Sequence, residues 1–446
     1  MRLTFKSTLL VTPLTLVVTW TPAAIAAGTV DTAPSPRPLV VDDDRTQCAD
    51  ADFTTIQDAI DAAAPGDVVR VCPGIYTKTT DVDGPLVTVD KPLTLRGEPE
   101  TIQEIDCFAA TYSPPDPTRQ VVIQAPSSST TEPPVLLKAD GVELQGFVFQ
   151  GVTIDNGLWA VETSPAHSGY RVAHNVFQSN LVAIRFGSSG DAPSEFDHNC
   201  LRDNRFGFST GFDHFVVNAR VHHNDTFRHE RAAYELARPT AQPNSTVDVT
   251  FDHNVSRQDG GSFGAYHLMS THRTTVSQNI VESATRRAIH LDGGNEALHI
   301  LDNTLGAQAA GIAQHSTPLP PPNWYVEIRG NSITGGTSAG IGMGIGALNR
   351  STIADNVVTG TTGEGIALIV GNTDNVVSGN VVTSSSRNGI WAGLGATGNT
   401  FVGNEMHDNG AVPGTADAHD DNDPINTWTG NVCGTDIPAG AICGAH

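Results

Sequence analysis

The chain contains little lysine and few aromatic residues. Only four of its 446 residues are lysine, at positions 6, 78, 91 and 138, so the central part of the chain has no lysine base. Aromatic residues make up 6% of the sequence, which suits a narrow core filled by Ile, Val, Leu and Ala. The net charge of −23 disfavours nucleic acid as a partner, because such binding depends on neutralising phosphates. It leaves open an anionic polysaccharide if positive charge is concentrated locally.

Long apolar runs are also missing. After the N-terminus no stretch approaches the roughly 20 apolar residues that a membrane-spanning helix needs, so we expect no membrane span. The N-terminus has the features of a secretory signal, with Arg2 and Lys6, the mostly apolar stretch Leu9–Trp20, and Ala24-Ile25-Ala26 at the cleavage position. We expect residues 1–26 to be removed, residues 27–39 to be a flexible leader, and the mature protein to be secreted. Its oligomeric state is left open.

Six cysteines in a secreted chain indicate disulfides. We pair Cys48 with Cys72 at the N-terminal end and Cys433 with Cys443 at the C-terminal end. Cys107 and Cys200 remain; a bond between them would pin an irregular segment to the body of the protein, but sequence alone does not establish their connectivity.

Asparagine recurs along the chain at nearly one period. The spacings are 24, 25, 30, 25, 24, 28, 25, 24 and 24 residues, between Asn175, Asn199, Asn224, Asn254, Asn279, Asn303, Asn331, Asn356, Asn380 and Asn404. A fixed period in this range indicates a repeat protein whose units bury their apolar faces only by stacking. Asn tolerates the left-handed conformation of tight turns, and its amide can bond to the Asn one unit above and below. We therefore interpret the asparagines as a structural ladder.

A second motif keeps step with the ladder. A small residue and an apolar residue open a segment of period-2 alternation, which is typical of strands, as in Ala183-Ile184, Gly207-Phe208, Ala288-Ile289 and Gly365-Ile366. About 24 residues per unit leave room for three short strands and three turns, and none for a helix. The sequence thus predicts coils of three strands that pair in parallel about 4.8 Å apart.

This pattern resembles the right-handed parallel β-helix family, the pectate-lyase-like fold with PbH1 repeats, in its secreted bacterial form. The resemblance covers roughly residues 40–446 and extends to Phe53–Ala63, in which Ile56, Ala59, Ile60 and Ala63 form one apolar helical face. Thr54 or Thr55 can cap this helix, which would close the open end of the first coil. The resemblance implies an all-β solenoid with an N-terminal cap at 40–66, coils over 67–431 and a C-terminal cap at 432–446. We expect Ile102–Pro134, rich in Pro, Ser and Thr, to be a long loop.

The repeat also predicts which outward-facing residues share a column. Two residues after each small residue stand Glu162, Arg185, Ser209, Glu235, His267, His290, Ala313, Gly342, Ala367 and Trp391. Glu235, His267 and His290 should stack about 4.8 Å apart, and Asp292 and His315, two residues further along their strands, should face the same way. Insertions at Ala237–Thr246 and Pro318–Asn323 interrupt the period here and can form groove walls.

These residues carry our functional hypothesis. Enzymes of the family cleave uronate polymers by β-elimination, and the resemblance implies such a polysaccharide lyase. We expect Glu235, His267, His290 and Arg287 to be catalytic, with a histidine as base and Glu235 orienting it. A guanidinium can pair with the substrate carboxylate. We expect substrate binding by Arg231, Arg257, Asp259, Arg286, Asp292 and His315.

Other functions remain open. Glycoside hydrolysis needs two carboxyl groups, for which Glu235, Asp259 and Asp292 are candidates, and uronate epimerases share the fold. A solenoid can also bind glycans without chemistry, and a charged stripe can be a merely solvated surface.

Metal binding is a further alternative. His174, His198, His223 and His253 precede four successive ladder asparagines and would form an imidazole column. Some relatives are associated with copper, and imidazole suits copper or zinc, but no Cys or Met joins this column and a His before an Asn is a plausible turn residue. We assign no metal site. Calcium remains a candidate cofactor at the acidic runs Asp42–Asp44 and His419–Asp423, where solvated loops are the commoner explanation.

Overall fold

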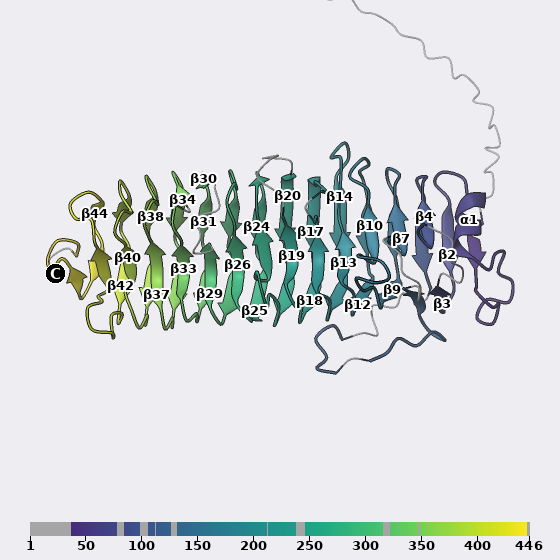
Figure 1. The fold of residues 1–446 in the computed structure, drawn as a ribbon, viewed down its shortest axis with the longest axis horizontal. Coiled ribbons are helices and arrows are strands. Elements are labelled where there is room, and N and C mark those ends of the chain that lie inside the picture. The colour runs from purple at the N-terminus through teal and green to yellow at the C-terminus, as the bar shows by residue number, and fades with distance from the viewer. Residues whose placement is uncertain are drawn as a thin grey trace, which may run out of the picture. The chain divides into compact units, whose positions relative to one another are not determined.

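The computed structural model describes residues 37–77, 84–98, 106–111, 113–125, 132–211, 213–237, 246–314, 322–346 and 348–443. The predicted signal peptide, and the leader up to residue 36, lie outside these residues. Pro38–His446 forms one compact unit, in which short strands are stacked coil upon coil along one axis (Figure 1). Every strand pairing within the described residues is parallel, and the coils build three long sheets. The predicted right-handed parallel β-helix is confirmed.

The three sheets are named here by their first strands. The β1 sheet consists of β1 (Leu39–Val41), β2 (Val68–Val71), β5 (Thr94–Gly97), β8 (Glu143–Gln145), β11 (Arg171–Ala173), β14 (Ser194–Asp197), β17 (Val217–His222), β20 (Thr246–Asp252), β24 (Thr275–Ser277), β27 (His299–Leu301), β31 (Glu327–Arg329), β35 (Thr352–Ala354), β38 (Val376–Ser378), β41 (Thr400–Val402) and β44 (Thr427–Thr429), with β23 (Thr271–His272) beside β20. The β3 sheet consists of β3 (Gly74–Thr77), β6 (Val121–Gln124), β9 (Phe147–Gln150), β12 (Val176–Gln178), β15 (Cys200–Arg202), β18 (Asp225–Phe227), β21 (Val255–Arg257), β25 (Ile280–Ala284), β28 (Thr304–Ala307), β32 (Ser332–Thr334), β36 (Val357–Thr359), β39 (Val381–Thr383), β42 (Glu405–His407) and β45 (Val432–Cys433).

The β4 sheet carries the repeated small-apolar motif. It consists of β4 (Val87–Val89), β7 (Val135–Leu137), β10 (Val161–Thr163), β13 (Val182–Arg185), β16 (Phe206–Ser209), β19 (Ala232–Leu236), β22 (Tyr266–Leu268), β26 (Arg287–Leu291), β29 (Ala310–Gln314), β33 (Ala339–Met343), β37 (Glu364–Leu368), β40 (Ile390–Ala392), β43 (Ala418–Asp420) and β46 (Asp436–Ile437). A separate pair is formed by β30 (Asn323–Trp324) and β34 (Leu348–Asn349).

The asparagine ladder is continuous. In each step the side-chain Oδ1 of one Asn accepts the backbone N–H and the Nδ2–H of the Asn one coil before it, as Asn303 does from Asn279 at 2.9 and 3.0 Å. The same Nδ2 also donates to a strand carbonyl, here Phe251 O at 3.0 Å. The ladder runs from Asn175 through all ten predicted members to Asn431. It satisfies buried amides in the coils from Asn175 to Asn431.

The core is a single stack of apolar side chains inside the coils. Aromatic rings continue from coil to coil within it, and Tyr234 and Tyr266 stack with ring centroids 4.6 Å apart. These two tyrosines are fully buried and each immediately precedes an outward-facing polar residue of the predicted column. Packing of the tyrosines therefore also fixes the strands that carry the column.

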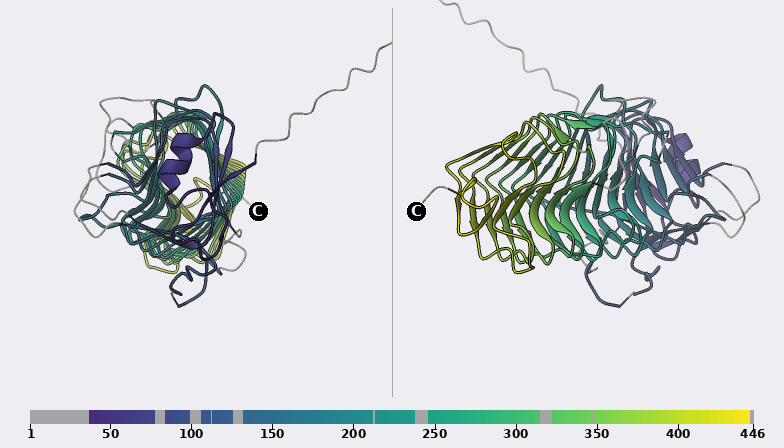
Figure 2. Two further views of the ribbon diagram at one scale, coloured as in Figure 1. Left: turned by 90° about the vertical axis from the view of Figure 1, so that its right-hand side faces the viewer. Right: turned by 60° about the vertical axis from the view of Figure 1, so that its left-hand side comes forward.

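The N-terminal end is closed as predicted. Helix α1 (Ile56–Ala62) buries Ile56, Ala59 and Ile60, and Thr55 is its N-cap, accepting from the Asp58 N–H. The helix covers the end of the first coil, as the end-on view in Figure 2 shows. No helix in the described part of the chain has the length and apolar character that crossing a bilayer requires.

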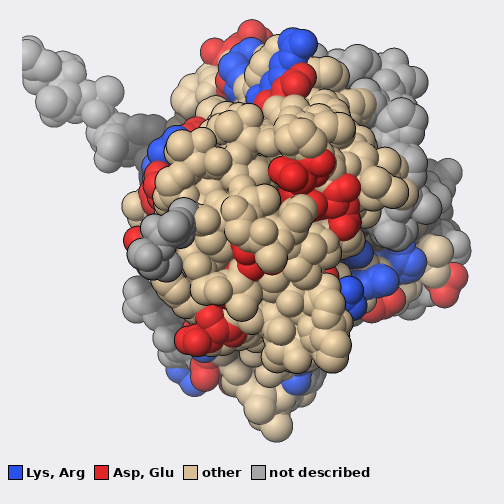
Figure 3. Space-filling model, turned by 90° about the vertical axis from the view of Figure 1, so that its left-hand side faces the viewer, with Lys and Arg blue, Asp and Glu red and all other residues tan. Residues whose placement is uncertain are grey.

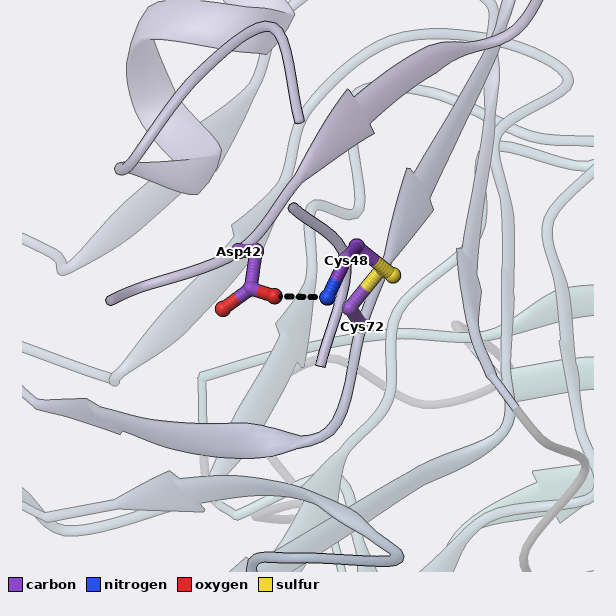
Figure 4. Close-up of side chains that lie close together, drawn as sticks. All are labelled: Asp42, Cys48 and Cys72. Carbon is purple, nitrogen blue, oxygen red and sulfur yellow. Dashed lines mark hydrogen bonds between the residues drawn. A yellow bond between two sulfur atoms is a disulfide. The ribbon is translucent and has the colours of Figure 1, made fainter. Parts of the chain in front are cut away.

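Figure 3 looks along the solenoid from its C-terminal side, where uncharged residues predominate and acidic residues form small separate groups. At the N-terminal end the carboxylate of Asp42 is fully buried and accepts the backbone N–H groups of Cys48 and Arg45. Asp42 thus closes the loop that the Cys48–Cys72 disulfide also holds (Figure 4).

The two predicted cysteine pairs, Cys48–Cys72 and Cys433–Cys443, are bonded. Cys107 and Cys200, whose connectivity the sequence left open, also form a disulfide. The expectation that Ile102–Pro134 is a loop throughout is wrong, because Val121–Gln124 within it forms the coil strand β6. The segment 106–111, which precedes β6, forms no coil strand. It is held to β15 by the Cys107–Cys200 disulfide. Arg202 of β15 also donates to Ala109 O at 2.9 Å.

Replacing Asn279 by Ala tests the ladder. The change leaves the N–H groups of Asn254 without their acceptor and should lower the free energy of unfolding by about 1–3 kcal/mol, measured by denaturant titration. Thr304→Ala, at an exposed position on β28, is the matched control and should be near neutral. Equal stability of both variants would show that the ladder does not hold the coils together.

Candidate active site

The predicted outward column lies in register on the β4 sheet. Successive members pair directly across neighbouring strands, from Glu162 and Arg185 through Ser209, Glu235, His267, His290, Ala313, Gly342 and Ala367 to Trp391. In β19 all five residues are buried, and β22 is buried throughout. An outward face that is covered rather than solvated indicates a recessed site in the central coils.

Three residues of the central coils form a carboxylate–imidazole–carboxylate chain. His267 Nδ1 lies 3.2 Å from Glu235 Oε1, and His267 Nε2 lies 2.8 Å from Asp292 Oδ2. The other Glu235 oxygen accepts the hydroxyl of Ser209. Glu235, His267 and Asp292 are 8%, 5% and 9% exposed, so these hydrogen bonds are shielded from water.

His290 extends this chain. Its ring stacks on that of His267 with centroids 5.1 Å apart, and its Nε2 lies 3.3 Å from Asp292 Oδ1. Phe263 stacks on the other side of His267, 4.5 Å between centroids. Asp292 therefore contacts both imidazoles.

The environment moves the pKa values of the two histidines in opposite directions. Burial disfavours the charged form of His267, but the hydrogen bonds and charges of Asp292 and Glu235 outweigh it and raise the pKa to about 9. Burial also lowers the pKa of His290, to about 4, because Asp292 compensates only in part and the charge of His267 opposes protonation. Despite its own burial, Asp292 has a lowered pKa because both histidines donate to it. At neutral pH the pair is an imidazolium beside a neutral imidazole.

Two cavities follow one another along the column. The first, about 430 Å³, is lined by Ser209, Glu235, His267 and Asp292 together with Trp159, Phe206 and Phe263. The second, about 390 Å³, is lined by Arg287, Ala313, Gly342, Ala367 and Trp391. His290 occupies the column position between them. Small side chains at Ala313, Gly342 and Ala367 line the second cavity. We refer to the two cavities, with the column position between them, as the groove of the β4 sheet.

Two arginines lie along this groove. Arg231 lines the first cavity, with its guanidinium 5.6 Å from the Phe263 ring centroid, and Arg287 lines the second. One buried nitrogen of each guanidinium has no hydrogen-bond partner among the described residues. Burial and the neighbouring charge of Arg286 lower the pKa of Arg287. A buried donor without a partner is costly, and an anion in the groove would supply one.

Not all predicted residues reach the groove. Arg257 is on the β3 sheet, where its guanidinium covers the Phe108 ring at 4.1 Å and pairs with Glu282. Asp259 is fully buried and bonded to the backbone N–H and Nδ1 of His229 at 2.7 and 2.8 Å. Both side chains stabilise turns of the solenoid. Neither lies in the groove, contrary to our expectation that both bind substrate.

The remaining expectations have different outcomes. Arg286 donates to Ser262 O at 3.0 Å and lines neither cavity. His315 lies outside the described residues, as do residues 238–245 and 318–321 of the two insertions expected to form groove walls. The expectation that Glu235 contacts a histidine is confirmed by its contact with His267.

Arg185 and Asp213, which line the first cavity, and Glu162 and His214 beside them were omitted from our site prediction. Arg185 lies 4.0 Å above the Trp159 ring centroid and pairs with Asp213. Glu162 accepts from Trp159 Nε1 at 2.6 Å and contacts His214 Nε2 at 2.9 Å. Glu162 and Arg185 stand in the predicted column, so the repeat could have identified them. Asp213, His214 and Trp159 lie in turns outside the repeat pattern.

The pKa of His267 tests the electrostatics of the site. Replacing Glu235 by Gln removes one of two carboxylates that hold the imidazolium, so this pKa should fall below about 9. It can be followed by NMR titration of the imidazole nitrogens. Glu282→Gln, which removes a carboxylate on the β3 sheet, should leave the pKa unchanged. An unaltered His267 titration in Glu235→Gln would contradict the assigned hydrogen bond.

The chain shows limited similarity to known proteins. Residues 244–443 match the family model of NosD, described as a periplasmic copper-binding protein; this is less than half of the chain. No curated protein matches the sequence. The chain is similar in structure to the A-module of mannuronan C-5 epimerase AlgE4 from Azotobacter vinelandii, with 14% identity, a TM-score of 0.44, and coverage of 87% of this chain and 95% of that one.

Two further solved structures are similar over a smaller share of their own length. The α-1,3-glucanase of family GH87 from Streptomyces thermodiastaticus has 17% identity and a TM-score of 0.43, with coverage of 84% of this chain and 64% of that one. The PL6-family alginate lyase AlyGC has 12% identity and a TM-score of 0.44, covering 89% and 53%. At these identities the relatives' activities are not transferred to this chain. Its strand pairing makes the chain a parallel β-helix protein.

Proposed function

We propose that this chain is a secreted enzyme that cleaves a uronate-containing polysaccharide by β-elimination in the groove of the β4 sheet. The observation that carries the proposal is the stacked pair His267 and His290, whose pKa values lie on opposite sides of neutrality at about 9 and about 4. Neighbouring titratable groups held in opposite protonation states are the arrangement that acid–base catalysis requires. The three disulfides fit the extracellular or envelope location, and we retain residues 1–26 as the proposed signal peptide.

The groove favours a polymer over a small substrate. His267 lines the first cavity and Ala313 the second, while His290 is between them in the column. With coils about 4.8 Å apart, a chain that fills both cavities passes over His290. Trp159 and Trp391 line opposite ends of this path and present rings on which sugars can pack.

Two arginines favour an acidic sugar. Arg231 and Arg287 flank the histidine pair and each has a buried guanidinium nitrogen without a partner among the described residues. A guanidinium binds a carboxylate through parallel N–H donors. In β-elimination this pairing neutralises the uronate carboxylate and so acidifies the adjacent C–H.

The protonation states suggest the roles of the histidines. His290, neutral at pH 7, is assigned as acceptor of the α-proton. His267, protonated at pH 7 and lining the first cavity, is assigned as donor to the leaving glycosidic oxygen, which must replace Glu235 or Asp292 as the acceptor of one of its N–H groups. Glu235 and Asp292 hold the His267 ring by its two nitrogens and are positioning residues. The sequence-based hypothesis left both histidines open as bases; the two pKa values favour His290.

Hydrolysis is less well supported by this geometry. Glu235 and Asp292 bind opposite edges of the His267 ring, so their bonded oxygens are farther apart than the spacing of about 5–5.5 Å used by retaining glycosidases. An inverting pair would fit the wider spacing. Epimerisation uses the same proton abstraction and would return the proton to the opposite face of the sugar.

Incubation with a panel of uronate-containing and neutral polysaccharides tests the reaction class. We expect absorbance of the unsaturated uronate product to rise together with reducing ends, on uronate polymers only, with calcium present or absent in parallel samples. An increase in reducing ends without a rise in absorbance would indicate hydrolysis instead of elimination. Altered uronate stereochemistry without cleavage, detected by NMR, would indicate an epimerase. No change in any polymer would contradict an enzymatic function.

Variants and a pH profile test the assigned roles. His267→Gln and His290→Gln should each lower kcat/KM by about 10²–10⁴-fold, the usual contribution of an acid or base. His299→Gln, at a histidine on the β1 sheet, is the control and should retain full activity. Because His267 must be protonated to donate, kcat/KM should fall as pH rises through about 9. A rise through that pH would show that His267 acts as the base.

A further inference from the structure

The first cavity of the groove has extensive apolar walls. Half-buried apolar side chains from the coils of β10, β13, β16 and β22 line it, namely Leu158, Leu181, Val182, Phe206, Phe263 and Met269. The Trp159 ring lines it as well. A sugar that enters this cavity therefore meets hydrocarbon on several sides.

Most polar side chains of the first cavity are bonded to one another. The pairs are Ser209–Glu235, Glu235–His267, His267–Asp292 and Arg185–Asp213. A sugar hydroxyl in the cavity must displace one of these bonds or give up the hydrogen bonds that it makes to water. Because a hydroxyl buried without a partner is costly, the cavity favours a sugar whose hydroxyls are esterified.

The second cavity has an unpaired donor and an unpaired acceptor. One guanidinium nitrogen of Arg287 and the Oε1 of Gln314 are buried without a hydrogen-bond partner among the described residues, and both side chains line this cavity. Ser338 and Glu364 line it too. A uronate with free hydroxyls and a carboxylate can supply both missing partners. The two cavities therefore suit different sugars.

The assigned chemistry indicates which sugar each cavity receives, and this step rests on the proposed elimination. His267, the donor to the leaving oxygen, lines the first cavity. His290, the acceptor of the α-proton, lies in the column between the cavities. The first cavity therefore receives the sugar that leaves, and the uronate that loses its α-proton lies over His290.

We propose that the first cavity binds an O-acetylated sugar, so that the enzyme prefers acetylated uronate polymers. An acetyl ester replaces the hydroxyl donor by a carbonyl, which only accepts, and by a methyl group that packs against Met269 and Leu181. The guanidinium of Arg231, 6.0 and 5.6 Å from the ring centroids of Phe206 and Phe263, is the donor for that carbonyl. A guanidinium has several N–H groups, so Arg231 can hold a sugar carboxylate as well.

Elimination rates on acetylated and unacetylated polymers test the proposal. The probes are polymannuronate, polyguluronate and polygalacturonate, each before and after partial O-acetylation with acetic anhydride. For the polymer that is cleaved, we expect kcat/KM to be about 10–200-fold higher in the acetylated form, the discrimination that an apolar pocket gives for one methylene. An equal or lower kcat/KM on the acetylated polymer would overturn this inference and leave elimination intact.

A matched pair of variants assigns the preference to the first cavity. Met269→Gln nearly conserves volume and places an amide in the apolar wall, so the preference for the acetylated polymer should fall by about 10-fold or more. Ile369 lines the second cavity and directly follows β37, as Met269 directly follows β22. Ile369→Gln should leave the preference unchanged. An unchanged preference in Met269→Gln, or an equal loss in both variants, would contradict the assignment.

Calorimetry separates this inference from the proposed reaction. His290→Gln, which leaves the lining of the first cavity intact, should bind an acetylated uronate hexasaccharide more tightly than the unacetylated one. Equal affinities would overturn the acetyl pocket, whatever the reaction. Tighter binding of the acetylated form, without unsaturated product from any polymer with the unaltered protein, would support the pocket and overturn the elimination.

Discussion

The structure depends on the register between coils, and the asparagine ladder is the interaction that fixes it. Each ladder amide accepts two N–H groups of the preceding Asn and donates to a strand carbonyl, so it satisfies buried polar groups that would otherwise oppose stacking. A shift of one residue between neighbouring strands would turn inward-facing side chains outward. Because the ladder forbids that shift from Asn175 to Asn431, residues many positions apart in the sequence meet at fixed spacing on each sheet.

The candidate active site arises from this register. Glu235, His267 and His290 come from three successive coils, yet they pair strand to strand, with stacked tyrosines fixing two of these strands from inside. The histidines before the ladder asparagines are aligned by the same constraint on the β1 sheet. A rigid repeat can thus hold functional groups from separate coils without a specialised loop.

Periodic features could be predicted from the sequence, and features outside the period could not. The ladder spacing predicted the coils, and the small-apolar motif predicted every member of the column from Glu162 to Trp391, because strand alternation fixes which side chains point outward. The same ruler failed for Arg257, which ends strand β21 on the β3 sheet, and for Asp259, which lies in the turn after it, because their positions depend on tertiary contacts with Phe108 and His229. Asp213 and His214 were missed for this reason. The opposite pKa shifts of His267 and His290 could not be predicted from the repeat pattern either. They depend on burial and on the contacts of Asp292 with both rings.

The most direct test of the account is a crystal structure of the His267→Gln variant with a uronate hexasaccharide. The account predicts that the oligosaccharide runs along the column of the β4 sheet, crosses His290 between the two cavities, and places sugar carboxylates at Arg231 and Arg287. Binding on another sheet, or across the coils rather than along them, would contradict the assignment of this groove as the active site.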